Sequence, residues 1–304
     1  MAVLTARAAL LVNPASRRGA DSEAAVRRAF AAAGLQPTVA YTRAAGDGER
    51  VARELAASHD QLFILGGDGT VMEAVTGLAA MGAALPIGIL AAGTGNQLAR
   101  ALGISLSPPR AVAQLLRGTA HRMDVGVLNG HRRVGIGVGL GLDAAMIAGA
   151  HGILKERLGA ASYVVSATAA ASRPRRFGVR AVVDGRIIER QASVAMVLNL
   201  GRVFNELIEI APGASLVDGQ LDLVIVETRS LLDALNFSIF EMLLRRRHAD
   251  HRWTFARGAA ISIETAEDDV PAQVDGDLIN ARRLAMVIAP LGAQFLMPAD
   301  SRLV

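Results

Sequence analysis

A short glycine-rich segment constrains the fold of this chain more than any other feature. Gly66-Gly67-Asp68-Gly69-Thr70 follows the apolar run 62–65 and precedes a segment with a helical pattern. Adjacent glycines allow the main chain to approach a phosphate closely, and free amides at the start of a helix favour its negative charge. A strand, a glycine-rich turn and a helix in this order are typical of an open α/β sheet, which binds ligands at the carboxyl ends of its strands.

A second turn of the same kind follows the next predicted strand. Residues 87–90 are apolar, and Gly93-Thr94-Gly95-Asn96 comes shortly after them, at the start of another helical pattern. Two such turns on neighbouring strands converge on one crevice, so the pair predicts a phosphate site. The segment is not a Walker A loop, because no Gly-Lys-Ser/Thr follows, and the first strand ends in Asn13-Pro14 rather than in a dinucleotide fingerprint. Asp68 could hold Mg²⁺ through water, Thr70 offers a hydroxyl, and Glu73 lies one helical turn further on.

The pattern along the chain predicts two domains. Residues 1–124 alternate strands with helices, which, with the two glycine-rich turns, predicts a nucleotide-binding α/β domain with a parallel, doubly wound sheet. Residues 125–290 predict a second domain, a mainly antiparallel β-sandwich, and the tail 291–304 could return to the first domain. The expected strands are 7–12, 38–41, 61–65, 86–90, 132–139, 177–184, 186–198, 221–227, 259–264 and 284–289. The expected helices are 22–33, 47–58, 70–81, 96–102, 108–117, 154–171 and 230–247.

Composition excludes several classes of protein. The 304 residues are 52% hydrophobic and contain no cysteine, so thiol chemistry and disulfides are excluded and a cytoplasmic setting is expected. No uncharged apolar stretch reaches the roughly 18 residues that a membrane-spanning helix needs. Basic residues cluster at Arg173–Arg176 and in the segment 245–252, which would suit phosphates or an ordinary solvated helix end. With a single Trp and 4% aromatic residues, a stacking surface for nucleic acid is not expected.

The ordered set of motifs resembles the diacylglycerol kinase catalytic-domain family, which includes bacterial lipid kinases and sphingosine kinases. The resemblance covers nearly the whole chain and is far more specific than any single motif. It rests on Asn13-Pro14 with Gly19, Thr42, Gly66–Thr70, Gly93–Asn96, Asp124-Val125-Gly126, Gly141-Leu142-Asp143-Ala144, Asp218-Gly219-Gln220-Leu221-Asp222 and Asp275-Gly276-Asp277. It implies an ATP- and Mg²⁺-dependent enzyme that transfers the γ-phosphoryl group to the hydroxyl of a membrane lipid, such as a diacylglycerol or a sphingoid base. It also implies that the first domain is of the NAD-kinase/phosphofructokinase-like kind and that the second domain, 125–290, takes the lipid substrate.

The resemblance also implies a role for individual residues. Asp275 matches the general base, with Asp68, Asp124 and Asp277 as the other catalytic acids. A structural Mg²⁺ site is implied at Asp218, with main-chain oxygens near Ser215 and Gln220. The residues implied for ATP are Asn13, Thr42, Gly66, Gly67, Asp68, Gly69, Thr70, Glu73, Gly93, Thr94, Gly95 and Asn96.

Two positions depart from the family pattern. Gln97 stands where many members have Asp, and Asp277 stands where Glu is usual. An NAD kinase-type enzyme, whose glycine-rich turn is similar, is an alternative, and so is a catalytically impaired homologue that only binds lipid or nucleotide. Each Asp that precedes a Gly could also be only a turn residue. Reversible contact with a membrane surface and a homodimer are further expectations, and docking through the segment 245–252 is one way to make that contact.

Overall fold

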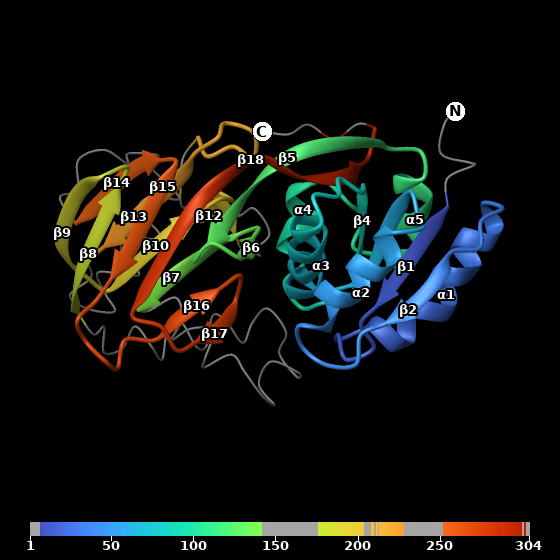
Figure 1. Ribbon diagram of the computed structural model, residues 1–304, viewed down its shortest axis with the longest axis horizontal. Helices are drawn as coiled ribbons and strands as arrows, with labels where there is room; N and C mark the ends of the chain where they lie inside the picture. Colours follow the sequence, from blue (N-terminus) through green and yellow to red (C-terminus); the bar gives the residue numbers. More distant parts are fainter. Residues whose placement is uncertain are drawn as a thin grey trace.

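The computed structural model describes residues 7–141, 176–203, 208–209, 211, 213–227, 252–299 and 301. Two parts lie side by side along the long axis of the molecule, and the helices of the described residues gather in one of them (Figure 1). Strands β5 (Thr119–Leu128) and β18 (Arg283–Met297) pair antiparallel and run between the two parts. The two halves of the chain therefore share one continuous strand pair.

The first part alternates strands with helices. They are β1 (Ala8–Val12), α1 (Gly19–Ala32), β2 (Thr38–Tyr41), α2 (Asp47–Ala56), β3 (Gln61–Gly66), α3 (Asp68–Ala80), β4 (Ile87–Ala91), α4 (Gln97–Ala101) and α5 (Pro108–Leu115). The strands are parallel in the order β2-β1-β3-β4, and β1, β3 and β4 are buried along their whole length. Helix α1 packs against α5 and α2 against α3, as expected for a parallel sheet covered on both faces. This confirms the predicted doubly wound α/β architecture.

Helix α3 begins two residues earlier than the sequence pattern predicts. Gly67 precedes the helix with an extended backbone, and Asp68 is the first helical residue. The glycine-rich segment therefore includes the last residue of β3, Gly66, and the first three residues of α3, with only Gly67 between them. This start places the amides of residues 68–70 among the free donors of the first helical turn.

The second part is built from antiparallel strands. They are β6 (Arg132–Val134), β7 (Gly137–Gly141), β8 (Phe177–Val183), β9 (Arg186–Ala192), β10 (Val194–Leu198), β11 (Arg202–Val203), β12 (Ile208–Glu209), β13 (Leu221–Val226), β14 (Trp253–Gly258), β15 (Ala260–Glu264), β16 (Ala272–Val274) and β17 (Asp277–Ile279). Among the described residues, one sheet has the order β14-β13-β10-β7-β16-β17, and the other continues from β4 through β18, β15 and β8 to β9. A second apolar core, which includes Val138, Val197 and Ile263, lies between these sheets. The predicted sandwich is confirmed.

Two segments predicted as single strands are divided in the structure. The run 132–139 breaks after β6, because the amides of Gly135 and Ile136 donate to the carboxylate of Asp275 instead of to a neighbouring strand. The run 186–198 breaks at Ser193, where the chain leaves β9 in one sheet and enters β10 in the other. The predicted helices 154–171 and 230–247 lie outside the described residues, as does most of the basic segment 245–252.

Strand β18 reaches into the apolar core of the first part. Phe295 pairs with Ile87 of β4, and Phe295, Leu296 and Met297 are buried in that core. The β5–β18 register shifts between Ala289 and Ala293, and Leu291 within this bulge has a φ of 51°. Because β5 runs through the predicted boundary at residue 124 and β18 through that at residue 290, the division into domains stays a prediction.

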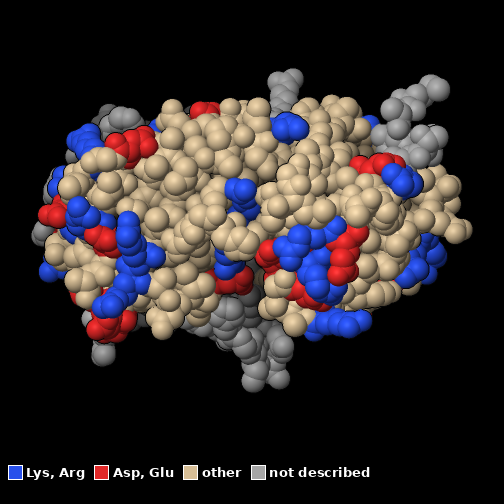
Figure 2. Space-filling model, in the orientation of Figure 1, with Lys and Arg blue, Asp and Glu red and all other residues tan. Residues whose placement is uncertain are grey.

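The exposed charges are mixed in sign. Figure 2 shows Lys and Arg interspersed with Asp and Glu on the visible face. On α2, Arg50 pairs with Asp47 and Glu54, and Arg53 pairs with Glu49. Such exposed pairs contribute little to stability. No helix in the described part of the chain is long and apolar enough to cross a membrane.

The approach of α2 to α3 depends on a glycine. A Cβ placed on Gly77 of α3 would lie 2.2 Å from the main-chain oxygen of Glu49 in α2. Gly77→Ala should therefore lower the free energy of unfolding by about 1–3 kcal/mol, because the helices must separate, although alanine favours a helix. Gly178→Ala in β8 is the control, since its nearest neighbour would be 3.8 Å away. Equal denaturation midpoints for the two variants would contradict the tight packing.

Candidate active site

The two glycine-rich turns meet at the carboxyl ends of β3 and β4. A Cβ placed on Gly93 would lie 2.6 Å from the Cα of Gly67, so the two main chains are in direct contact. Asn96, which has a φ of 50°, closes the second turn by accepting from the amide of Gly93 and donating to its carbonyl, each at 2.9 Å. Thr94 and Gly95 remain partly exposed beside this contact. The expected convergence of the two turns is present.

Asp68 joins the first turn to the second through main-chain amides. Its two carboxylate oxygens accept from the amides of Gln97 and Leu98, each at 3.0 Å. Burial raises the pKa of Asp68, while these amides and the charge of Arg100 act in the opposite direction. A carboxylate oxygen has more than one lone pair, so each oxygen of Asp68 can still accept from water or a metal.

Asn13 and Thr70 connect the end of β1 to the first turn. The side-chain amide of Asn13 donates to Oγ1 of Thr70 at 2.8 Å, and Thr70 itself is buried. Thr42 is also buried and donates its main-chain amide to the carbonyl of Val12. The ends of the first three strands are thus gathered around the glycine-rich turn.

Glu73 binds the main chain before and within α2. Its Oε1 accepts from the amide of Gly46 at 2.7 Å and its Oε2 from the amide of Gly48 at 3.0 Å. The carboxylate therefore stabilises the start of α2, where amides would otherwise lack partners. Glu73 positions the loop that follows Thr42, and its predicted contact with phosphate stays a prediction.

In the second part of the molecule, Asp275 is held by the main-chain amides of three consecutive residues. It lies in the β16–β17 turn with a φ of 50°; its Oδ1 accepts from Ile136 at 2.8 Å and Gly137 at 3.0 Å, and its Oδ2 from Gly135 at 3.1 Å. Burial raises the pKa of Asp275 to about 6, although the three amides and the charge of Arg132 lower it. A carboxylate with a raised pKa in a site that binds ligands is a candidate general base.

The turn that carries Asp275 reaches the first glycine-rich turn. A Cβ on Gly69 would lie 3.5 Å from Oδ2 of Asp277, two residues after Asp275. Arg132 on β6 lies 3.5 Å from the same oxygen, and Asp277 is largely exposed. The structure therefore brings one acid of the second part, Asp277, beside the first glycine-rich turn.

Asp124 holds the main chain of two remote segments. Its buried carboxylate accepts from the amides of Gly219 and Leu291, each at 2.7 Å. Its carbonyl accepts from the side-chain amide of Asn199 at 3.1 Å, which also donates to the carbonyl of Gly135 at 3.1 Å. Since Gly135 donates to Asp275, Asp124 is connected to that carboxylate through Asn199.

The implied metal site at Asp218 contains an arginine. Oδ1 of Asp218 accepts from the amide of Gln220 at 3.0 Å, and Oδ2 accepts from Nη2 of Arg257. Ser215 accepts from the amide of Val217 at 3.4 Å. Within the described ranges there is no group of three or more His, Asp or Glu residues arranged to hold a metal ion. The Mg²⁺ predicted here stays a prediction, with a guanidinium already beside its carboxylate.

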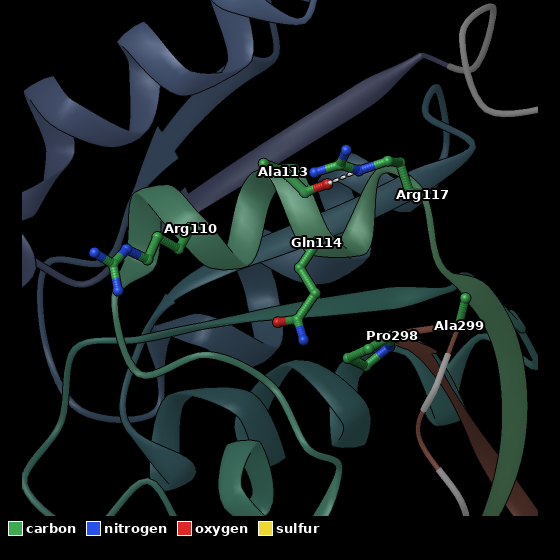
Figure 3. A pocket seen from close by; sticks show the side chains of 6 residues that line it. All are labelled: Arg110, Ala113, Gln114, Arg117, Pro298 and Ala299. Carbon is green, nitrogen blue, oxygen red and sulfur yellow. Dashed lines mark hydrogen bonds between the residues drawn. The ribbon is translucent and has the colours of Figure 1, made fainter.

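Two surface pockets lie apart from the predicted site residues. One of about 360 Å³ is formed by α5, by Arg117 in the turn after this helix and by Pro298-Ala299; Nε of Arg117 donates to the carbonyl of Ala113 in α5 (Figure 3). The other, of about 680 Å³, is lined by residues of β8, β9 and β15 and by residues 265–266 and 282–283. Neither contains a residue that the sequence predicted for the site.

Sequence reasoning missed three side chains and a group of main-chain amides that contribute to the site. They are Asn199, Arg132, Arg257 and the three amides that hold Asp275. The density of glycines from Gly135 to Gly141 was the available signal for the amides, because a Cβ on Gly137 would lie 2.6 Å from the carbonyl of Val197. A lone Asn or Arg gives no such signal.

Comparison with known proteins gives a consistent result across the chain. The family model of the diacylglycerol kinase catalytic domain matches residues 7–128, and that of the YegS C-terminal NAD kinase beta sandwich-like domain matches residues 137–296. The chain is 28% identical to "Diacylglycerol kinase" of Bacillus subtilis strain 168, over 93% of this chain and 96% of that one. It is 29% identical to "Probable lipid kinase YegS-like" of Pseudomonas aeruginosa strain PAO1, over 97% and 95%.

A solved structure shows the same fold. The chain matches a crystal structure of a diacylglycerol kinase from Bacillus anthracis str. Sterne with a TM-score of 0.73, at 20% identity, over 97% of this chain and 98% of that one. Both parts of the molecule and their arrangement are therefore those of a known architecture.

The side-chain amide of Asn199 links Asp124 to Gly135, one of the residues that hold Asp275. Asn199→Asp replaces a buried amide that donates to two carbonyls with a carboxylate that cannot donate. We expect the free energy of unfolding at neutral pH to fall by about 1–3 kcal/mol or more, because both carbonyls lose their donor and a charge is buried. The control is Asn129→Asp, whose side chain accepts from Ala285 at an exposed position. Chemical denaturation that finds both variants equally stable would remove Asn199 from this role.

Proposed function

We propose, from the premise that the chain belongs to the diacylglycerol kinase catalytic-domain family, that it transfers the γ-phosphoryl group of ATP to the hydroxyl of a membrane lipid. It is a kinase with an alcohol acceptor, and ATP is the substrate that such a kinase implies. Diacylglycerol and sphingoid bases are the proposed acceptors. The observation that supports the proposal is the approach of Asp277, two residues after the proposed base Asp275, to Gly69 of the first glycine-rich turn.

The phosphates of ATP are proposed to lie along the joined glycine-rich turns. Amides of residues 67–70 face the open end of the sheet at the start of α3, and Thr70 and Thr94 supply hydroxyls. The direct contact of Gly67 with Gly93 leaves no Cβ at the centre of this surface, so a phosphate could approach both main chains.

Mg²⁺ is the cation expected with ATP, and Asp68 is the residue that fits it. The Asp68 oxygens each retain a lone pair beside the phosphate-binding amides. The ion would neutralise phosphate charge and orient the γ-phosphoryl group. We assign Asp124 a positioning role, because its two oxygens hold the main-chain amides of Gly219 and Leu291, each at 2.7 Å.

Asp275 is proposed to accept the proton of the lipid hydroxyl. Its Oδ1 accepts two amides but its Oδ2 only one, so Oδ2 retains a lone pair for the alcohol. The alcohol oxygen attacks the γ-phosphorus, the bond to the bridging oxygen of the β-phosphate breaks, and ADP leaves. Asp277 balances the charge of Arg132 at the mouth of the site.

Substrate class is tested directly with the purified protein. It is incubated with Mg-ATP and vesicles that contain diacylglycerol or a sphingoid base, and the products are identified by mass spectrometry; a parallel reaction contains NAD. We expect a phosphorylated lipid with wild type and strongly reduced product with Asp275→Asn. NADP as the only product would establish the NAD kinase alternative. ATP or lipid binding without turnover on any acceptor would establish an impaired homologue.

The pH dependence of transfer should report the state of Asp275. Because its pKa is raised to about 6, the carboxylate is ionised above that value and becomes protonated below it. A general base must be ionised, so kcat/KM with diacylglycerol should fall as the pH drops below about 6. ATP also titrates in this region, so the titrations of ATP and of Asp275 must be separated. The residual activity of Asp275→Asn should not fall below about pH 6 in the way that wild-type activity does. An identical fall in that variant would contradict the assignment.

Contact with a membrane and self-association are proposed as well. A lipid kinase must reach a substrate held in a bilayer, so reversible binding to a membrane surface follows from the proposed acceptor. The basic segment 245–252 suggested by the sequence lies mainly outside the described residues. The homodimer likewise stays a prediction.

A further inference from the structure

Arg257 is surrounded by oxygen atoms of one turn. It lies on β14 directly opposite Asp222 of β13, and its Nε is 2.9 Å from Oδ1 of that residue. Its Nη2 donates to Oδ2 of Asp218 and to the carbonyl of Gly213, the latter at 3.2 Å. One guanidinium thus contacts two carboxylates and a main-chain oxygen of the segment 213–222.

These oxygens are of the kind that a hard divalent cation binds. Carboxylates and main-chain carbonyls are the usual protein ligands of Mg²⁺ and Ca²⁺. Asp222 is buried, with 8% of its side chain exposed, so its charge is shielded from water and needs a counter-charge; Asp218, with 25% of its side chain exposed, contacts the same guanidinium. The guanidinium supplies it, and a second cation at Asp218 would be repelled by it.

The shape of this turn matters beyond the turn itself. Gly219, with a φ of 70°, donates to the carboxylate of Asp124, which also holds the amide of Leu291 in the bulge of β18. Asp124 is connected in turn to the Gly135–Asp275 bond through Asn199. The conformation of residues 213–222 therefore bears on the strand pair that the two parts of the molecule share.

We propose that the guanidinium of Arg257 is the structural cation of this turn, in the position that the family resemblance would give to Mg²⁺. The turn holds its shape without a divalent ion, and removal of the guanidinium opens the site to one. The inference is independent of the proposed function, because it concerns the protein without nucleotide and is measured by stability and metal binding.

The experiment compares melting of nucleotide-free protein in chelator with melting over a series of Mg²⁺ concentrations, at matched ionic strength. The variants are Arg257→Met, which removes the charge but keeps an extended side chain, and Arg257→Met combined with Asp218→Asn. We expect the melting temperature of wild type to be the same with and without Mg²⁺. Arg257→Met should melt several degrees lower and regain part of the loss as Mg²⁺ saturates, and the double variant should gain nothing.

Calorimetric titration with Mg²⁺ gives a second measurement if Arg257→Met does not fold. Wild type and Asp218→Asn should then give the same heats, because Asp218 binds no ion. Saturable stabilisation of wild type by Mg²⁺ that is lost in Asp218→Asn would overturn the proposal. So would an Arg257→Met variant that melts like wild type, or one whose loss Mg²⁺ does not reduce.

Discussion

A hydrogen bond from a main-chain amide to the carboxylate of a remote residue is the interaction on which this site is assembled. Asp68 joins the first glycine-rich turn to α4, Glu73 joins α3 to α2, and Asp275 joins the β16–β17 turn to residues 135–137. Bonds of this kind to an ionised acceptor are stronger than those between neutral groups. The bonds of Asp68 and Glu73 fix segments that no strand ladder connects, and those of Asp275 hold residues 135–137, where the chain enters β7 beside β16.

These bonds explain how acidic residues can be buried here at neutral pH. An unpartnered buried carboxylate would be costly, whereas amides fixed by the surrounding main chain replace the lost hydration. The balance differs between sites: three amides and the charge of Arg132 do not fully offset burial at Asp275, so its pKa stays above its ordinary value. A carboxylate that is held rigidly and still takes up a proton near neutral pH suits proton transfer. The buried setting that fixes the position of the Asp275 carboxylate is thus also the cause of its raised pKa.

The sequence predicted those parts of the site that depend on local pattern. The turns at Gly66–Thr70 and Gly93–Asn96 were found because a strand, glycines and a helix follow one another within a few residues, and their convergence follows from the adjacency of parallel strands. Partners across long separations were not predictable. Nothing near Asn199 indicates that it bridges the carbonyls of Asp124 and Gly135, and nothing near Arg257 indicates that it contacts Asp218, 39 residues away. The strand predicted at 132–139 was wrong for the same reason, since its interruption is caused by Asp275.

Gln97 departs from the pattern of the family at a position beside Asp68. The bond from residue 97 to Asp68 is made by its main-chain amide, so the side chain is not needed to hold the two turns together. The side chain of Gln97 lies near the carboxylate of Asp68, because both approach Gly95. A Cβ on Gly95 would be 3.4 Å from Oδ2 of Asp68 and 3.8 Å from Cγ of Gln97. An acid at 97 would add a like charge next to Asp68 and to any bound phosphate. A neutral Gln lowers that repulsion while the main-chain bond that organises the turns is retained, so the substitution alone is no argument against catalysis.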